Sequence, residues 1–132
     1  MTTSGEGRPV EYYDPFDGKL GFALASRTPG LIHVAGMTGF KADDMSVPED
    51  LSDQMRLAYT NIAGILDHYG RKLSDAVEQT GFVVGDAAAA GKIFTGVAGE
   101  IFGSSPPPCT MVGVTGLVDA RYKVEIKLTA RD

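Results

Sequence analysis

The chain has 132 residues, of which 43% are hydrophobic and 22% charged, with a net charge of −5 and one cysteine. These values predict a single globular domain over residues 1–132, with a partly flexible N-terminal segment at 1–15. The twelve Lys and Arg form no run, which argues against nucleic acid as a partner. The sequence has neither the apolar run of about 18 residues that a membrane helix needs nor the pattern of a signal peptide. A single cysteine cannot form an intramolecular disulfide. We therefore expect a cytoplasmic protein without a membrane partner.

The first expected elements are two short strands at residues 19–26 and 31–36. They are separated by residues 27–30, which end in Pro29-Gly30, a strong turn signal. This pattern predicts a β-hairpin.

A helix is expected next. Ser46 and Glu49 have the spacing of a capping box, Pro48 suits a first helical turn, and Gly70 marks the C-terminal end. Apolar residues recur every three or four positions and predict one face packed on a sheet. These residues are Leu51, Met55, Ala58, Ile62, Ile65, Leu66 and Tyr69.

The second half of the chain predicts a buried strand at 77–84 and a second helix, capped by Asp86, that runs to about Phe102. The expected buried face of this helix is Ile93, Phe94, Val97 and Ile101. Gly91, Gly96 and Gly99 indicate close helix packing. Two alternating strands at 109–114 and 124–128 complete the order β-β-α-β-α-β-β.

This order predicts an α+β fold, a mixed sheet with two helices on one face. Alternation places Cys109, Met111 and Gly113 on one side of their strand, and Val112 and Val114 on the other. Both sides are largely apolar. We therefore expect the sheet face away from the helices to be covered by other subunits of a homo-oligomer.

Cys109 and Glu125 are the first candidates for chemistry, because a lone thiol and a lone carboxylate could face each other across neighbouring strands. Cys109 is either a small buried hydrophobe or a substrate-contacting thiol. Glu125 is either a general base or acid in a cleft, or a structural carboxylate bonded to backbone donors. The functional interpretation is favoured for Glu125, because a carboxylate in an apolar strand is costly to keep without a use.

Several residues together resemble the RidA/YjgF family of small trimeric proteins over about residues 19–130. They are Gln54, Asn61, Ile65-Leu66, Gly70, Phe82-Val83, the proline-led strand at 106–114 and Val124-Glu125-Ile126. The resemblance implies a chorismate-mutase-like fold and a homotrimer with a central β-barrel and three clefts between subunits. In active family members these clefts hydrolyse enamines and imines such as 2-aminoacrylate to a ketone and ammonia, with no metal or organic cofactor.

The resemblance also implies roles for particular positions. Family deaminases hold the substrate carboxylate with an arginine after the proline of the penultimate strand, and Cys109 stands there. The glutamate that orients water is retained as Glu125. The other implied substrate contacts are Phe22 in the first strand in place of a tyrosine, Ala35-Gly36-Met37 in place of a Ser-Gly-Gln-like segment, Thr95 in place of an asparagine, and Met111.

The leading hypothesis is therefore a cofactor-independent hydrolase or deaminase acting on an imine, enamine or related C–N bond. A buried carboxylate without its arginine costs several kcal/mol, so 2-aminoacrylate is not expected to bind in the usual mode. The alternative is a non-catalytic trimer that binds a metabolite or a protein partner in the same clefts. Arg27, Arg121 and His33 are the remaining side chains that could reach a cleft. The acidic charge argues against the ribonuclease activity described for some relatives.

Overall fold

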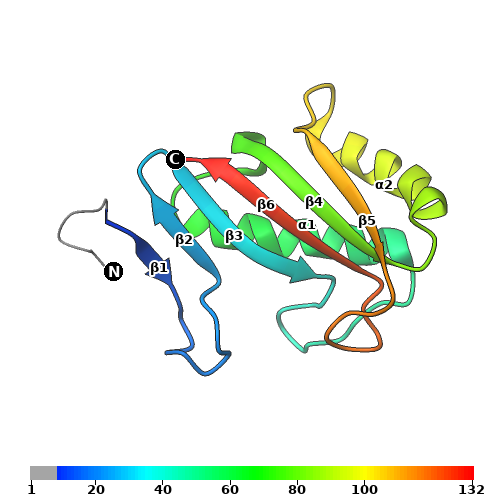
Figure 1. Ribbon diagram of the computed structural model, residues 1–132, viewed down its shortest axis with the longest axis horizontal. Coiled ribbons are helices and arrows are strands. Elements are labelled where there is room, and N and C mark those ends of the chain that lie inside the picture. The colour runs from blue at the N-terminus through cyan, green and yellow to red at the C-terminus, as the bar shows by residue number, and fades with distance from the viewer. Residues whose placement is uncertain (1–8) are drawn as a thin grey trace.

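The alternating segments pair into one six-stranded sheet, and both amphipathic segments form helices on the same face of it (Figure 1). In this computed structural model, the described residues are 9–132. The elements are β1 Glu11–Tyr13, β2 Ala25–Thr28, β3 Leu31–Thr38, α1 Leu51–His68, the 3-10 turn η1 Leu73–Asp75, β4 Ala76–Val84, α2 Ala87–Phe102, β5 Cys109–Val114 and β6 Val124–Arg131. The predicted α+β class and mixed sheet are confirmed.

The strands lie in the order β1-β2-β3-β6-β4-β5. Among the strands of residues 9–132 only β4 and β5 run parallel, because α2 carries the chain back between them; the other pairs are antiparallel. The last strand in sequence, β6, inserts between β3 and β4. The two strands expected to be neighbours, β5 and β6, are therefore separated by β4.

The predicted hairpin is present as β2 and β3. Thr28 pairs with Leu31, which leaves Pro29 and Gly30 as a two-residue turn, and Gly30 has the positive φ of 85° that this turn needs. The first predicted strand is misplaced, since residues 19–24 form turns and bends and β2 begins at Ala25.

A short strand that the sequence did not predict, β1, pairs with β2 at the outer edge of the sheet. It falls inside the segment 1–15 that was expected to be partly flexible. Residues 1–8 of that segment lie outside the described residues.

The N-cap of helix α1 lies four residues after the predicted cap. Its N-cap is Asp50, whose carboxylate accepts from the backbone N–H of Asp53, so the capping box of Ser46 and Glu49 is wrong. The predicted end is confirmed. Gly70 (φ 70°) donates to the carbonyl of Asp67, and the next N–H donates to Leu66, which is a Schellman motif.

The core lies between the sheet and the two helices. The predicted stripe of α1 is buried or half-buried. Helix α2 buries Phe94 and Val97 as predicted, but Ile93 is 42% exposed, which corrects its assignment to the core. Side chains added at Gly91, Gly96 or Gly99 would meet no atom within 4 Å among the described residues, so these glycines do not mark a helix contact within the chain.

The other sheet face carries no helix (Figure 1). At its β4–β5 end this uncovered face is apolar, with Val84 39% and Val112 37% exposed and Phe82 half-buried. Toward β6 it is polar, with Lys127 and Arg131 exposed. Val84, Val112 and Phe82 form an apolar patch on the uncovered face.

Candidate functional site

Cys109 and Glu125 lie on opposite faces of the sheet. Cys109 pairs with Gln79, which faces the helices, whereas Glu125 pairs with Phe82, three positions further along β4, which faces away from them. The two backbones are also about 10 Å apart across the sheet, because β4 separates their strands. Within one chain the thiol and the carboxylate therefore do not line one pocket, which corrects the expectation that they face each other.

Glu125 lies directly over the backbone of Gly36 on the uncovered face. A Cβ at Gly36 would be 2.5 Å from Oε2 of Glu125 and 2.7 Å from its Cδ, so only glycine leaves room for this carboxylate. A bulge between Val34 and Met37 turns Gly36 toward Glu125. The half-buried carboxylate and the glycine backbone are the two predicted site groups that the fold brings together.

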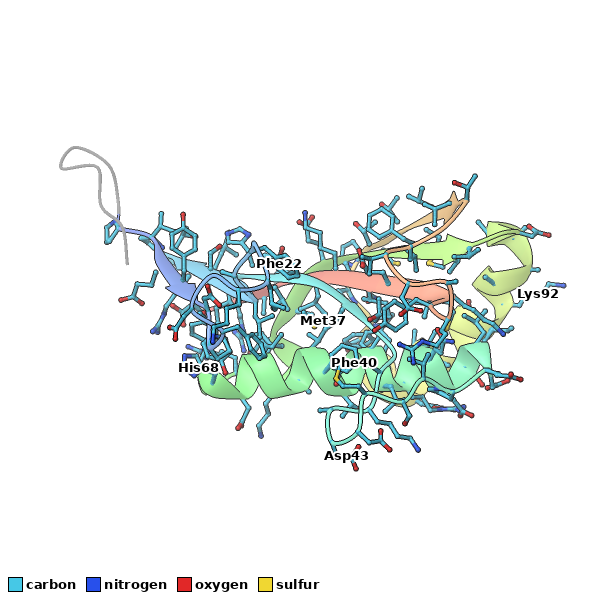
Figure 2. All side chains as sticks on the ribbon, turned by 90° about the horizontal axis from the view of Figure 1, so that it is seen from below. Phe22, Met37, Phe40, Asp43, His68 and Lys92 are labelled. Carbon is cyan, nitrogen blue, oxygen red and sulfur yellow. The ribbon has the colours of Figure 1, made fainter. Side chains whose placement is uncertain are left out.

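The neighbours of Gly36 divide between the two faces. Ala35 is half-buried in the bulge. Met37 is 6% exposed and lies between the sheet and α1, as Figure 2 shows, so its side chain belongs to the core and cannot line the uncovered face. Thr38, which pairs with Glu125, is 6% exposed and takes the place beside the carboxylate.

Phe22 is not in a strand. It lies on the bend before β2 and is 55% exposed, at the level of the sheet (Figure 2). Phe16 and Leu20 of the same loop are 47% and 46% exposed. These three apolar side chains have little cover within residues 9–132, and they form an exposed apolar loop.

Cys109 and Met111 are on the helix side of the edge strand β5. Burial raises the pKa of the Cys109 thiol, and the backbone N–H of Gly81 opposes this only in part. Cys109 as a whole residue is nevertheless exposed, because β5 is the edge strand of the sheet formed by residues 9–132. Met111 covers Gly81, whose own Cβ would be 2.6 Å from the methionine sulfur. A raised pKa keeps the thiol neutral at neutral pH.

Thr95 lies on the exposed side of α2, and its hydroxyl donates to the carbonyl of Gly91 at 2.9 Å. This is a bond within its own helix. In one chain Thr95 is therefore separated from the carboxylate of Glu125 by the whole thickness of the sheet.

The two arginines that could replace the missing family arginine are both engaged. Arg27 donates to both oxygens of Asp132 at 2.6 and 3.1 Å and lies over the ring of Tyr69. Arg121 donates to both oxygens of Asp119 at 3.1 and 3.0 Å. Both guanidinium groups are therefore paired with a carboxylate of the same chain. His33 is half-buried on β3, 3.3 Å from the hydroxyl of Thr28.

Gln54 and Asn61, two residues of the family resemblance, hydrogen-bond to backbone groups, and Gln54 is fully buried. Its side chain bonds the carbonyls of Pro48 and Arg121 and the N–H of Lys123. The loop that carries Asp43 lies on the helix side of the molecule, away from the uncovered face (Figure 2).

One recess of about 570 Å³ opens between the ends of β4 and β5 and the start of α2. It is lined by Val84, Gly85, Asp86, Ala87, Gly113, Val114 and Thr115, none of which is a predicted site residue. Within residues 9–132 no group of three or more His, Cys, Asp and Glu side chains is arranged to bind a metal ion. No helix in the same range has the length and apolarity to cross a membrane.

Gln79 is the polar residue beside Cys109 that the sequence did not single out. It is 4% exposed, and its side-chain oxygen accepts from the hydroxyl of Tyr59 at 2.6 Å. The sequence does indicate this position, because alternation in the strand 77–84 places Gln79 with Gly81 and Val83 on the covered face of the sheet. A glutamine at such a position needs hydrogen-bond partners.

Comparison with known proteins agrees with this fold. A family model described as "Endoribonuclease L-PSP" matches residues 19–132. The RutC family protein YjgH of Escherichia coli is 35% identical over 111 residues, 83% of this chain and 82% of that protein. The crystal structure of Rv2704 from Mycobacterium tuberculosis, a member of the YjgF/YER057c/UK114 family, is 27% identical with a TM-score of 0.79, covering 94% of this chain and all of that one.

RidA from the Antarctic bacterium Psychrobacter sp. PAMC 21119 has the same fold, with 19% identity, a TM-score of 0.79 and coverage of 92% of this chain and 94% of that chain. The match of the family model over most of the chain and the 35% identity to YjgH confirm the resemblance seen in the sequence. The chain therefore belongs to the YjgF/RidA family.

Proposed function

We propose that the protein is a cofactor-independent hydrolase acting on the C=N bond of a small imine or enamine. The observation that carries the proposal is the contact between Glu125 and Gly36, which places a carboxylate beside the half-buried backbone of a glycine on the uncovered face. A carboxylate supplies a base for water, and a backbone group in a fixed position supplies a hydrogen-bonding group for substrate.

The reaction needs one water and returns every proton. The oxygen of water bonds to the imine carbon while Glu125 accepts a proton from that water and passes it to the nitrogen, which gives a neutral carbinolamine. Glu125 then takes the hydroxyl proton of the carbinolamine and delivers it to the nitrogen as the C–N bond breaks, and the products are a carbonyl compound and ammonia or an amine. An enamine first tautomerises to the imine, in which the carbon gains a proton and the nitrogen loses one.

The cleft requires a second copy of the chain. Glu125 and Gly36 belong to the uncovered face, while Cys109 and Met111 lie on the helix side of the edge strand β5. A homotrimer closed around the uncovered faces, as the resemblance implies, would bring the edge of one subunit to the carboxylate of the next. The apolar side chains at the β4–β5 end of that face, Val84 and Val112, support such burial.

In this cleft Cys109 contacts the substrate and does not attack it. Its pKa is raised by burial, so the nucleophilic thiolate is scarce at neutral pH. A neutral thiol replaces the cationic group that would hold a carboxylate. The substrate is therefore an imine or enamine other than 2-aminoacrylate bound in the usual mode.

The test measures release of the carbonyl product from imines formed in situ, by an amino-acid oxidase for acidic substrates and by an amine oxidase for neutral ones. Glu125→Gln should lower turnover at least about a hundredfold, because it removes the base and keeps the shape. Gly36→Ala should do the same by displacing the carboxylate. Gly64→Ala is the matched control, since a Cβ there meets nothing within 4 Å among the described residues. Full turnover in Glu125→Gln would contradict the mechanism.

Co-expression tests the shared cleft. Subunits with Glu125→Gln and subunits with Cys109→Trp are each expected to be inactive alone. Mixed trimers should recover part of the activity, because some clefts then combine two unaltered halves. A monomer in solution, or mixed trimers without activity, would reject the shared cleft. Inactivity of the unaltered protein on every imine would favour the non-catalytic binding protein.

A further inference from the structure

The helix side of the edge strand β5 holds a polar cluster that the hydrolytic step does not use. It consists of Gln79 on β4, Tyr59 on α1 and Cys109 on β5. Gln79 and Cys109 are direct partners on parallel strands and share a face, and the hydroxyl of Tyr59 donates to Oε1 of Gln79 at 2.6 Å. Gln79 and Tyr59 are 4% and 0% exposed, while Cys109 is exposed. Cys109 is thus the outer member of the cluster.

The amide nitrogen of Gln79 is fully covered and has no acceptor among residues 9–132. Tyr59 occupies the oxygen of the same amide, so Nε2 keeps both of its N–H groups unused. Buried amides are paired in nearly all proteins, and one that is not calls for an explanation. An unpaired donor beside an exposed thiol in a proposed substrate cleft indicates a place for an acceptor atom of a ligand.

The surroundings favour a neutral acceptor over a charged one. Burial and the nearby Cys109 raise the pKa of Tyr59, and the opposing hydrogen bond comes from Gln79. None of these groups is cationic at neutral pH. An ionised carboxylate brought here would lose its hydration without a counter-charge, whereas a carbonyl oxygen would gain an N–H bond at a smaller desolvation cost.

We propose that Gln79 is a specificity-determining residue of the cleft, and that its side-chain N–H binds the carbonyl oxygen of a neutral substrate such as a carboxamide or an ester. The ligand reaches the amide past the thiol of Cys109, whose side chain turns aside to admit it, because the amide nitrogen is otherwise covered. The proposal rests on the proposed function in one respect, namely that the cleft beside Cys109 is the substrate site. Where family deaminases bind a carboxylate with an arginine, this chain would bind an uncharged carbonyl group with a side-chain amide.

The experiment compares butanamide with butanoate, which have the same shape and differ in charge, on the full chain in its native assembly. Binding is followed by the ¹⁵N-labelled side-chain NH₂ signal of Gln79, which is assigned by its loss in Gln79→Met. Butanamide should shift this signal and bind about tenfold or more tightly than butanoate. In Gln79→Met the affinities for butanamide and butanoate should become about equal.

Two further variants separate recognition from folding. Tyr59→Phe removes the hydrogen bond to Oε1 but leaves the N–H groups, so it should keep the preference. The double variant Tyr59→Phe/Gln79→Met leaves no orphaned partner in the core and should lose the preference while remaining folded. A preference that survives in this double variant would overturn the proposal.

The proposal would also be overturned by equal affinities in the unaltered protein, by butanamide binding without a shift of the Gln79 signal, or by no binding of either probe at about 10 mM. Failure here is distinguishable from failure of the hydrolase. A Gln79-dependent amide preference without turnover of any imine would reject the hydrolase alone. Turnover of an imine, together with a preference for butanamide that is the same in Gln79→Met as in the unaltered protein, would reject this proposal alone.

Discussion

Gly36 has the largest local effect on the candidate site, because its missing side chain makes room for the carboxylate of Glu125. Gly39 has a similar role three residues later, where a Cβ would overlap the backbone of Gln54 on α1. A side chain can move away from a clash, whereas a helix backbone cannot. Gly36 therefore governs the site, and Gly39 governs the packing of α1 on the end of β3.

The reactivity of Cys109 should depend on pH, because the thiolate and not the thiol is the nucleophile. About 3% of an unperturbed cysteine thiol is ionised at pH 7. Because the pKa of Cys109 is raised, its ionised fraction should be smaller than that. Alkylation by iodoacetamide at pH 7 should be slower than for a free cysteine in a peptide, and it should accelerate as pH rises past 9. Mass spectrometry of the native protein over time measures the rate.

Cys109→Ser supplies the unlabelled control, because the chain has no other cysteine. Labelling at pH 7 that is faster than the peptide reference would mean that a nearby charge stabilises the thiolate, and it would restore the nucleophilic role.

At the scale of elements, polar side chains of α1 form hydrogen bonds with the backbone of neighbouring segments and so join the helix to the rest of the fold. Gln54 connects the segment before α1 with the loop that enters β6, through bonds of 2.7 Å to Pro48, 3.0 Å to Arg121 and 2.8 Å to Lys123. Asn61 bonds the carbonyls that follow β3. These contacts fix the end of β6 from which Glu125 projects.

Replacing Gln54 by leucine should lower the free energy of unfolding by about 2 to 4 kcal/mol. The substitution keeps the volume but removes a fully buried amide and its three hydrogen bonds, to the carbonyls of Pro48 and Arg121 and to the N–H of Lys123. Urea denaturation at fixed protein concentration gives the change.

Asn61→Leu is the matched control on the same helix. Asn61 is only half-buried, so water can replace its bonds, and the loss should be about 1 kcal/mol. An equal loss in both variants would show that burial of the Gln54 network adds nothing.

At the scale of the whole molecule, charge and apolar surface are unevenly distributed. The uncovered face is apolar near β5 and polar near β6, while carboxylates and arginines link η1 and the chain end to the strands. Arg27 holds the pKa of Asp132 below its ordinary value. The backbone N–H of Lys72 and, to a smaller extent, Arg131 do the same for Asp75.

These two carboxyl groups predict the direction of acid sensitivity. A folded-state pKa below the unfolded value adds stability that is fully present above the unfolded pKa, near 3.8, and is lost as pH falls through the lowered values. The free energy of unfolding should therefore fall as pH is lowered from about 5 toward 2, and Asp132→Asn with Asp75→Asn should flatten this dependence.

Denaturant unfolding at several pH values measures it. Lys92→Gln is the control, because it changes the net charge by one unit without removing an acidic group. It should leave the pH dependence of the free energy of unfolding unchanged. An equally steep loss in the double Asn variant would assign the acid sensitivity to other groups.

The sequence by itself indicated the family through the residues that resemble it. It also determined the α+β class and most elements, because these depend on local periodicity and on turn and cap residues such as Pro29-Gly30, Gly70 and Asp86. It missed β1, whose three residues are too few for a periodic signal, and it placed the start of α1 too early.

The relation between Cys109 and Glu125 was decided only by the tertiary structure. Residues close in sequence suggested neighbouring strands, but β6 pairs with β3 and β4, and a register difference of three residues puts the two side chains on opposite faces. The contact of Glu125 with Gly36 and the unpaired amide of Gln79 likewise arise from strand order and register. Both are long-range properties that local patterns do not encode.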